Sequence, residues 1–288
     1  MPRIELLRPT SVEDAVALLA NREGSRCIAG GQTMVAMLNA GLVEPPVLIA
    51  ISAIEELGAI VEQDDGTIRI GAAVCHRDVA QFSGCTGANA VIREAARVIA
   101  HPAIRNFGTI GGALAHADPA ADYPTAVVAA GATIEIAGAN GRRTMPSEEF
   151  FLDYLTTALE PGEMVTALQL AAPEAGSSGH YLKFSRVDGD YAIASVGVTL
   201  QAKDGRCTAA RLAIGGCGST PVFDPSANAL LLGSRCEETA IAAAAELLVS
   251  RADPVDDVRA SAAYRRALIP RLLRRAVRHA WSQAIGVQ

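Results

Sequence analysis

Two short segments with paired glycines, far apart in the sequence, constrain this chain more than any other feature. Ala29 to Thr33 reads AGGQT, and Thr109 to Gly112 reads TIGG. Each pair ends an apolar run, where backbone without side chains can approach a ligand closely and present consecutive N–H groups. A single glycine pair is more often a tight turn or a helix boundary. Two pairs with short polar neighbours favour one long phosphate-bearing ligand that is held at two places.

Composition sets broad limits on what the chain does. Its 288 residues are enough for two or three compact domains. Half of the residues are hydrophobic, but no run of about 20 apolar residues occurs, so the sequence predicts no membrane span. The N-terminal Met1–Glu5 segment has no apolar signal core, which predicts a cytoplasmic location. The net charge of −6 is mild and argues against a nucleic-acid partner.

The order of helix and strand patterns predicts an α+β chain with a division near residue 175. Ser11 is expected to cap a helix that reaches Leu19. Pro173–Gly179 is expected to be a linker, because it is rich in Pro, Gly and Ser. Runs of strands and then of helices follow it. We therefore predict domains at 1–175, with subdomains of about 1–55 and 56–175, and at 176–288.

Several segments in this order carry a resemblance to a known family. The chain resembles the FAD-binding medium subunit of molybdenum hydroxylases, a group that includes bacterial carbon monoxide dehydrogenases and xanthine dehydrogenases. The resemblance covers nearly the whole chain, and the order and spacing of its segments are more specific than any one of them. These segments are Ala29–Thr33, Ile104–Gly112, Gly189–Ala192, Leu212–Gly216 and Ala263–Arg266, with Leu272 and Arg275 in the C-terminal tail.

The resemblance implies a fold and a set of FAD contacts. It implies a two-subdomain FAD-binding domain of the PCMH type, followed by a C-terminal α+β domain with a small antiparallel sheet and helices. One loop would lie on the pyrophosphate, a second wall would supply further backbone N–H groups and hydrogen bonds to the ribityl or diphosphate region, and a tyrosine would lie near the flavin ring. By position, the loop is Ala29, Gly30, Gly31, Gln32, Thr33 and Met34, the second wall is Thr109, Gly111, Gly112 and Asp122, and the tyrosine is Tyr191.

The chain departs from the family pattern at three places. Ala113 stands where the family usually has Asn or Ser, which implies the loss of one polar contact. Tyr123 replaces a common Leu, and Cys217 falls in a glycine turn near the C-terminal strands. None of the three removes the glycines that are expected to face the phosphates.

The resemblance also implies partners. The six cysteines are scattered and form no Cys-x-x-Cys pair, so we expect iron–sulfur clusters on another chain. The implied assembly contains a large subunit with the molybdenum cofactor and a small subunit with 2Fe-2S clusters, as a dimer of heterotrimers. This chain would carry FAD and pass electrons from the clusters to an external acceptor.

Two other functions stay open at this point. The chain could be a free-standing FAD-dependent oxidoreductase with its own organic substrate, although few acid–base side chains lie near the glycine segments. It could also be a scaffold that has lost its flavin. His116 is expected to contact residues that bind the ligand rather than the ligand itself. The Arg-rich C-terminal helix is expected to pack on the protein with its charged face in solvent. The alternative is that this charged face contacts an acidic subunit.

Overall fold

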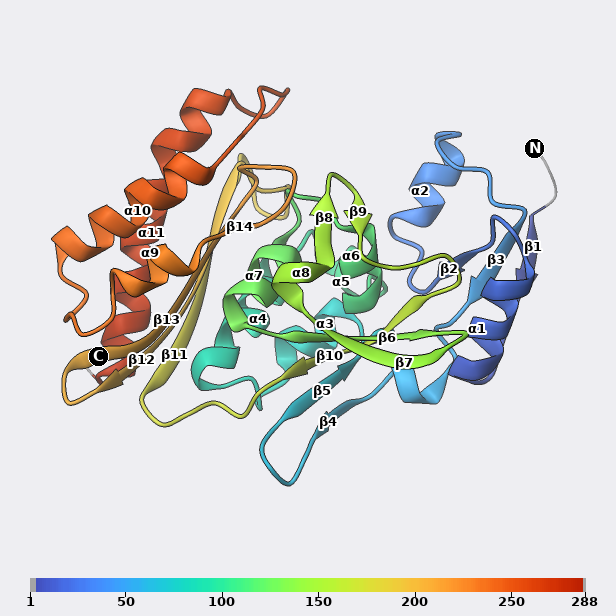
Figure 1. Cartoon of the computed structure of the whole chain (residues 1–288). Helices are drawn as coiled ribbons and strands as arrows, with labels where there is room; N and C mark the ends of the chain where they lie inside the picture. The colour runs from blue at the N-terminus through green and yellow to red at the C-terminus, as the bar shows by residue number, and fades with distance from the viewer. Residues whose placement is uncertain (1–3, 287–288) are drawn as a thin grey trace.

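The computed structural model describes residues 4–286, and its N-terminal unit is a small parallel sheet with two helices (Figure 1). Its elements are β1 (Glu5–Leu7), α1 (Val12–Asn21), β2 (Arg26–Ile28), α2 (Met34–Asn39) and β3 (Val47–Ala50). The strands lie in the order β1-β3-β2, and both pairings are parallel. Ser11 accepts the N–H of Asp14 at 3.1 Å, which confirms the predicted start of α1.

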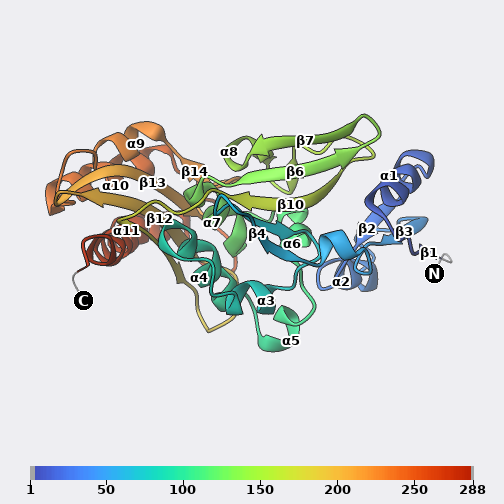
Figure 2. The same ribbon diagram turned by 90° about the horizontal axis from the view of Figure 1, so that it is seen from below.

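An antiparallel sheet of five strands lies in the middle of the molecule (Figures 1 and 2). Its strand order is β4-β5-β10-β6-β7. The central strand, β10, is therefore the last of the five in the sequence. These strands are β4 (Ile60–Glu62), β5 (Ile68–Gly71), β6 (Thr133–Gly138), β7 (Gly141–Pro146) and β10 (Met164–Leu170).

Short helices and one hairpin connect the strands of this middle sheet. The second glycine segment lies here, at the start of a helix. The connecting elements are η1 (Glu55–Leu57), α3 (His76–Gln81), η2 (Gly87–Asn89), α4 (Ala90–Val98), α5 (Pro102–Arg105), α6 (Ile110–His116), α7 (Asp122–Ala130), α8 (Ser147–Phe150), β8 (Phe151–Asp153) and β9 (Thr156–Thr157).

The C-terminal part is an antiparallel sheet covered by helices. Its strands follow the order β11-β12-β13-β14. The elements are β11 (Ser177–Phe184), β12 (Ala194–Lys203), β13 (Arg206–Gly215), β14 (Val222–Phe223), α9 (Pro225–Ala229), α10 (Glu238–Arg251) and α11 (Ala262–Ala284). The predicted α+β class, with a small antiparallel sheet and helices in the C-terminal part, is confirmed.

The C-terminal sheet is covered on both faces, because α4 and α7 of the preceding part lie on one side and α10 and α11 on the other (Figure 1). Side chains alternate along β12 accordingly. Val196 and Val198 enter the core with α10 and α11. Gly197 lies against Ala129 of α7, and the hydroxyl of Thr199 donates to the Ala129 carbonyl at 2.9 Å. This sheet therefore joins the two halves of the molecule.

The prediction of a linker over Pro173–Gly179 is wrong at its C-terminal end. Strand β11 begins at Ser177 and pairs with β12 along its whole length. Gly179 allows close packing rather than flexibility, because a Cβ atom there would lie 2.1 Å from the carbonyl oxygen of Ala88. Small residues that allow two segments to pack closely resemble linker residues in sequence. The domain boundary near residue 175 stays a prediction. Within residues 4–286, no helix is long and apolar enough to cross a membrane.

Candidate functional site

All the residues predicted for the site line one cavity of about 620 Å³. The cavity lies where the segment after β2 faces α6, the start of α7 and the loop that precedes β12. We call Ala29–Met34 the first wall, and Thr109–Gly112 with Asp122 the second wall. Tyr191 lies on the cavity from the loop before β12. The fold thus brings together residues from three distant parts of the chain.

The first wall presents backbone N–H groups that the protein itself leaves free. Within the described chain, the N–H groups of Gly30, Gly31, Gln32 and Thr33 donate to no other residue. Gly31 has φ of +73°, a backbone conformation that favours glycine, and its carbonyl accepts the N–H of Val35 at 2.9 Å. Consecutive free N–H groups in a turn form a concave site for an anion.

Gly30 has a different reason to lack a side chain. A Cβ atom at Gly30 would lie 1.7 Å from the carbonyl oxygen of Phe107, in the segment that leads to the second wall. The two glycine segments therefore approach each other directly, with only backbone between them. This close approach is what makes one cavity from two segments that are distant in the sequence.

The second wall is a helix start rather than an open loop, which corrects the expectation of free N–H groups there. Thr109 is the N-cap of α6, and its Oγ1 accepts the Gly112 N–H at 3.2 Å. The Gly111 N–H donates to the carbonyl of Ala72 at 2.9 Å. A Cβ atom at Gly111 would lie 2.4 Å from the Cβ of Ala72, whereas one at Gly112 would meet only Thr109 Oγ1 at 3.0 Å. Gly111 is therefore a packing glycine, and Gly112 leaves an open helix surface on the cavity.

Asp122 is held by buried partners that the sequence did not indicate. Its carboxylate accepts the Tyr181 hydroxyl at 2.9 Å and the Lys183 ammonium at 3.1 Å. Both side chains come from β11, so Asp122 ties the start of α7 to the C-terminal sheet. Burial raises the pKa of Asp122 to about 6, against the opposing charge of Lys183. The carboxylate is ionised at neutral pH and pairs with the ammonium.

Three residues that line the cavity have a buried polar side-chain atom without a partner within the described residues. These atoms are Ser25 Oγ, His76 Nδ1 and the hydroxyl of Tyr123, and the His76 and Tyr123 rings lie 5.3 Å apart between centroids. Burial, with the nearby charge of Arg105, lowers the pKa of His76 to about 4, so the imidazole is neutral at neutral pH. Buried polar groups normally have hydrogen-bond partners. These unpaired atoms fit a polar ligand such as FAD in the cavity, and sequence reasoning missed His76 altogether.

Tyr191 lies at the edge of the cavity and is 40 % exposed. Its ring lies beneath the guanidinium of Arg259, 5.1 Å from the ring centroid. Partial burial, with the negative charge of Asp118, raises the pKa of the phenol, which keeps it neutral. His116 also lines the cavity, from the last turn of α6.

Known proteins resemble the chain along nearly its whole length. Residues 2–173 match the model of an FAD binding domain in molybdopterin dehydrogenase, and residues 179–280 match the CO dehydrogenase flavoprotein C-terminal domain. The 6-hydroxypseudooxynicotine dehydrogenase complex subunit alpha of Paenarthrobacter nicotinovorans is 36% identical over 98% of this chain and 96% of its own. The carbon monoxide dehydrogenase medium chain of Hydrogenophaga pseudoflava is 33% identical over 98% of each chain.

Solved structures agree with these matches. Carbon monoxide dehydrogenase from Hydrogenophaga pseudoflava, in a form that lacks the Mo-pyranopterin moiety of its molybdenum cofactor, superposes with a TM-score of 0.94 at 35% identity, over 98% of each chain. Quinoline 2-oxidoreductase from Pseudomonas putida 86 superposes with a TM-score of 0.91 at 31% identity, over 99% of each chain.

Proposed function

Because the chain belongs to the FAD-binding medium subunits of the molybdenum hydroxylase family, we propose that it passes electrons from iron–sulfur clusters on a partner chain to an external acceptor. The chain is an oxidoreductase subunit with an FAD-binding domain. The proposal rests on the row of free N–H groups in the first wall. Both walls line the same cavity.

The residues of the cavity divide the contacts to FAD among them. The first wall, Ala29–Met34, binds the pyrophosphate through its backbone N–H groups. Gly112 gives the ligand access to the surface of α6, and Thr109, which already accepts one hydrogen bond, still has a hydroxyl proton to donate. Asp122 and Gly111 shape the second wall, and Tyr191 limits solvent access at the flavin ring. When bound, the flavin supplies the redox chemistry, and the protein supplies position and charge.

An exposed apolar surface near Tyr191 suits a partner chain. Leu152 and Tyr154 on the β8–β9 hairpin are 59% and 62% exposed, and Val187 in the loop before β12 is 64% exposed. Tyr154 is close enough to Tyr191 to influence its ionisation. Clustered exposed apolar side chains commonly mark protein–protein contacts. We therefore place the small iron–sulfur subunit here, next to the flavin ring.

The full assembly that we propose contains this chain, a large subunit with the molybdenum cofactor and a small subunit with 2Fe-2S clusters, as a dimer of heterotrimers in the cytoplasm. Medium chains of carbon monoxide dehydrogenases are among the relatives, which supports a subunit rather than a free-standing enzyme. Closed symmetric assemblies are the usual form of soluble oligomers.

Two measurements test the proposal. The purified chain, alone and with its partner chains, is precipitated with acid, and the released flavin is identified and counted; we expect about one FAD per chain. The chain is then assayed with organic substrates and an artificial acceptor, with and without the partners. We expect turnover only in the complex. Robust substrate oxidation by the chain alone would favour a free-standing oxidoreductase, and a chain that takes up no FAD in either form would indicate a scaffold.

A further inference from the structure

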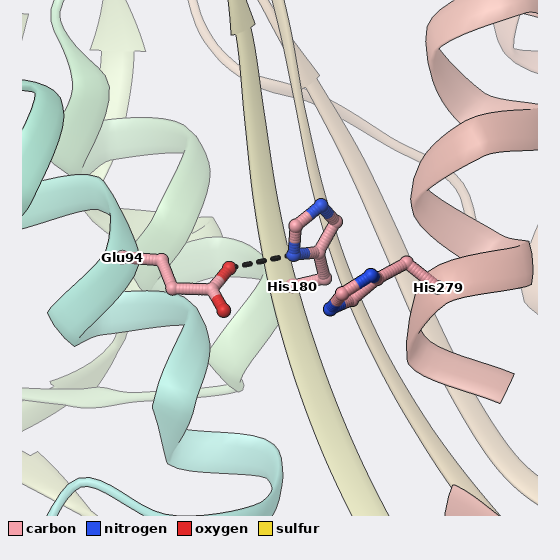
Figure 3. A group of neighbouring side chains, drawn as sticks. All are labelled: Glu94, His180 and His279. Atoms are coloured by element: carbon pink, nitrogen blue, oxygen red, sulfur yellow. Dashed lines mark ion pairs between the residues drawn. The ribbon is translucent and has the colours of Figure 1, made fainter. Parts of the chain in front are cut away.

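Three potential metal ligands from distant parts of the chain meet outside the cavity (Figure 3). They are Glu94 on α4, His180 on β11 and His279 on α11. One ligand atom from each lies within 4.8 Å of the others. No other group of three or more His, Cys, Asp or Glu residues has this spacing in the part of the chain that the structure describes. The cluster joins the FAD-binding part to the C-terminal helix.

The side chains of the cluster already point toward one another. Nδ1 of His180 lies 2.7 Å from Oε2 of Glu94, and the two imidazole rings are 4.0 Å apart between centroids with a tilt of 31° (Figure 3). The Glu94 and His180 side chains are only 25% and 18% exposed, whereas His279 lies on the exposed face of α11. His279 is therefore the solvent-facing member of the cluster.

The donor atoms of the cluster suit a cation. Glu94 supplies carboxylate oxygens, one of which accepts the Tyr181 N–H at 2.9 Å. His180 and His279 each supply a ring nitrogen, which has a lone pair for a metal when the imidazole is neutral. The cluster therefore combines two nitrogen donors with one oxygen donor.

Three basic side chains on the elements that carry the histidines have acidic partners. Arg274 and Arg278, on the same helix as His279, pair with Glu238 of α10 at 3.2 and 2.8 Å. Lys183, on the same strand as His180, pairs with Asp122. These pairings offset three of the positive charges on α11 and β11.

We propose that Glu94, His180 and His279 bind one divalent transition-metal ion of the Zn²⁺ type, which ties α4 to α11 across the C-terminal sheet. Two imidazoles and one carboxylate are a donor set that Zn²⁺ accepts in proteins, with a fourth position for water. The ion links two parts that meet through the packing of α4 and α7 on this sheet. Because it binds only the folded arrangement, it raises the stability of the junction.

The test uses the FAD-loaded chain without a histidine tag, treated with a chelator, desalted and titrated with ZnCl₂ by calorimetry. We expect one Zn²⁺ per chain and a higher midpoint of thermal unfolding in the presence of the ion. His279→Ala and Glu94→Gln should each weaken binding by more than about tenfold. His101→Ala removes an exposed histidine outside the cluster, and it should bind like the unmodified chain.

Circular dichroism and FAD content show whether each variant is folded. His279 is exposed, so its replacement leaves the fold intact and keeps the comparison valid. Equal Zn²⁺ affinity in His279→Ala and the unmodified chain would overturn the proposal, as would the absence of saturable binding in the unmodified chain. The second result would leave Glu94 and His180 as an ordinary ion pair. Neither result depends on electron transfer, so neither result tests the proposed function.

Discussion

The two walls of the cavity contain similar glycine pairs but use their backbones in opposite ways. In the first wall, the N–H groups from Gly30 to Thr33 donate to no residue within 4–286. In the second wall, Gly111 and Gly112 donate to Ala72 and to the cap Thr109. The N–H groups of the first wall are thus available to a ligand, whereas those of Gly111 and Gly112 are already hydrogen-bonded within the protein.

This difference predicts that mutations in the two walls have different main effects. Changes in the second wall should cost stability first, because its polar groups and glycines are engaged with the rest of the protein. Changes in the first wall should cost FAD affinity first. Each of the following variants tests this contrast.

Asp122→Ala should have the largest effect on stability. It removes the acidic partner of Lys183, whose side chain is only 5% exposed, and leaves a buried charge that donates only to the Val98 carbonyl, 2.6 Å away. We expect a loss of about 3–5 kcal/mol in the free energy of unfolding, measured by urea denaturation. The double variant Asp122→Ala/Lys183→Met removes both charges and should recover much of the loss. A fully stable Asp122→Ala protein with weak FAD binding would assign Asp122 to the ligand instead.

Gly111→Ala should have the next largest effect, and Gly112→Ala is its matched control. A Cβ atom at Gly111 overlaps Ala72, whereas the same atom at Gly112 meets only Thr109 Oγ1. We expect Gly111→Ala to lower the free energy of unfolding by about 1–3 kcal/mol, as overpacking does. Gly112→Ala should leave stability nearly unchanged, because alanine favours the helix. Equal losses in both variants would remove the distinction between the packing glycine and the open one.

The sequence predicted the positions of the walls better than it predicted their structure. Spacing and resemblance located every predicted site residue on the cavity, because glycines and a cap residue leave local signals. They did not separate Gly111 from Gly112, since the contact that distinguishes them is with Ala72, which is distant in the sequence. The pairing of Asp122 with Lys183 and the burial of His76 were missed for the same reason. Such contacts exist only after the sheets have assembled.

Gly31→Ala addresses the first wall, with Gly41→Ala as its control. Both glycines have positive φ, +73° and +66°, so alanine costs roughly 1–2 kcal/mol of backbone strain at either position. Only Gly31 lines the cavity. We expect both variants to lose stability, Gly31→Ala the more because its Cβ atom would lie 3.2 Å from Val35 Cγ2. Only Gly31→Ala should lose FAD affinity, by roughly tenfold or more, as measured by fluorescence titration of the flavin-free chain. A parallel loss of affinity in Gly41→Ala would show that strain alone explains the effect.

Among the variants that should lose stability, Thr109→Ala should lose the least, and it gives the most detailed test of the second wall. The loss of a threonine N-cap costs about 1 kcal/mol, measured by urea denaturation. The Thr109 hydroxyl accepts from Gly112 N–H and still has a proton to donate to FAD. Thr109→Asp separates these two roles, because a carboxylate caps a helix well but has no proton to donate and repels phosphate. We therefore expect Thr109→Asp to keep its stability and lose FAD affinity. If Thr109→Asp bound FAD as tightly as the unmodified chain, Thr109 would serve only as a cap, and the ligand would be held by the first wall alone.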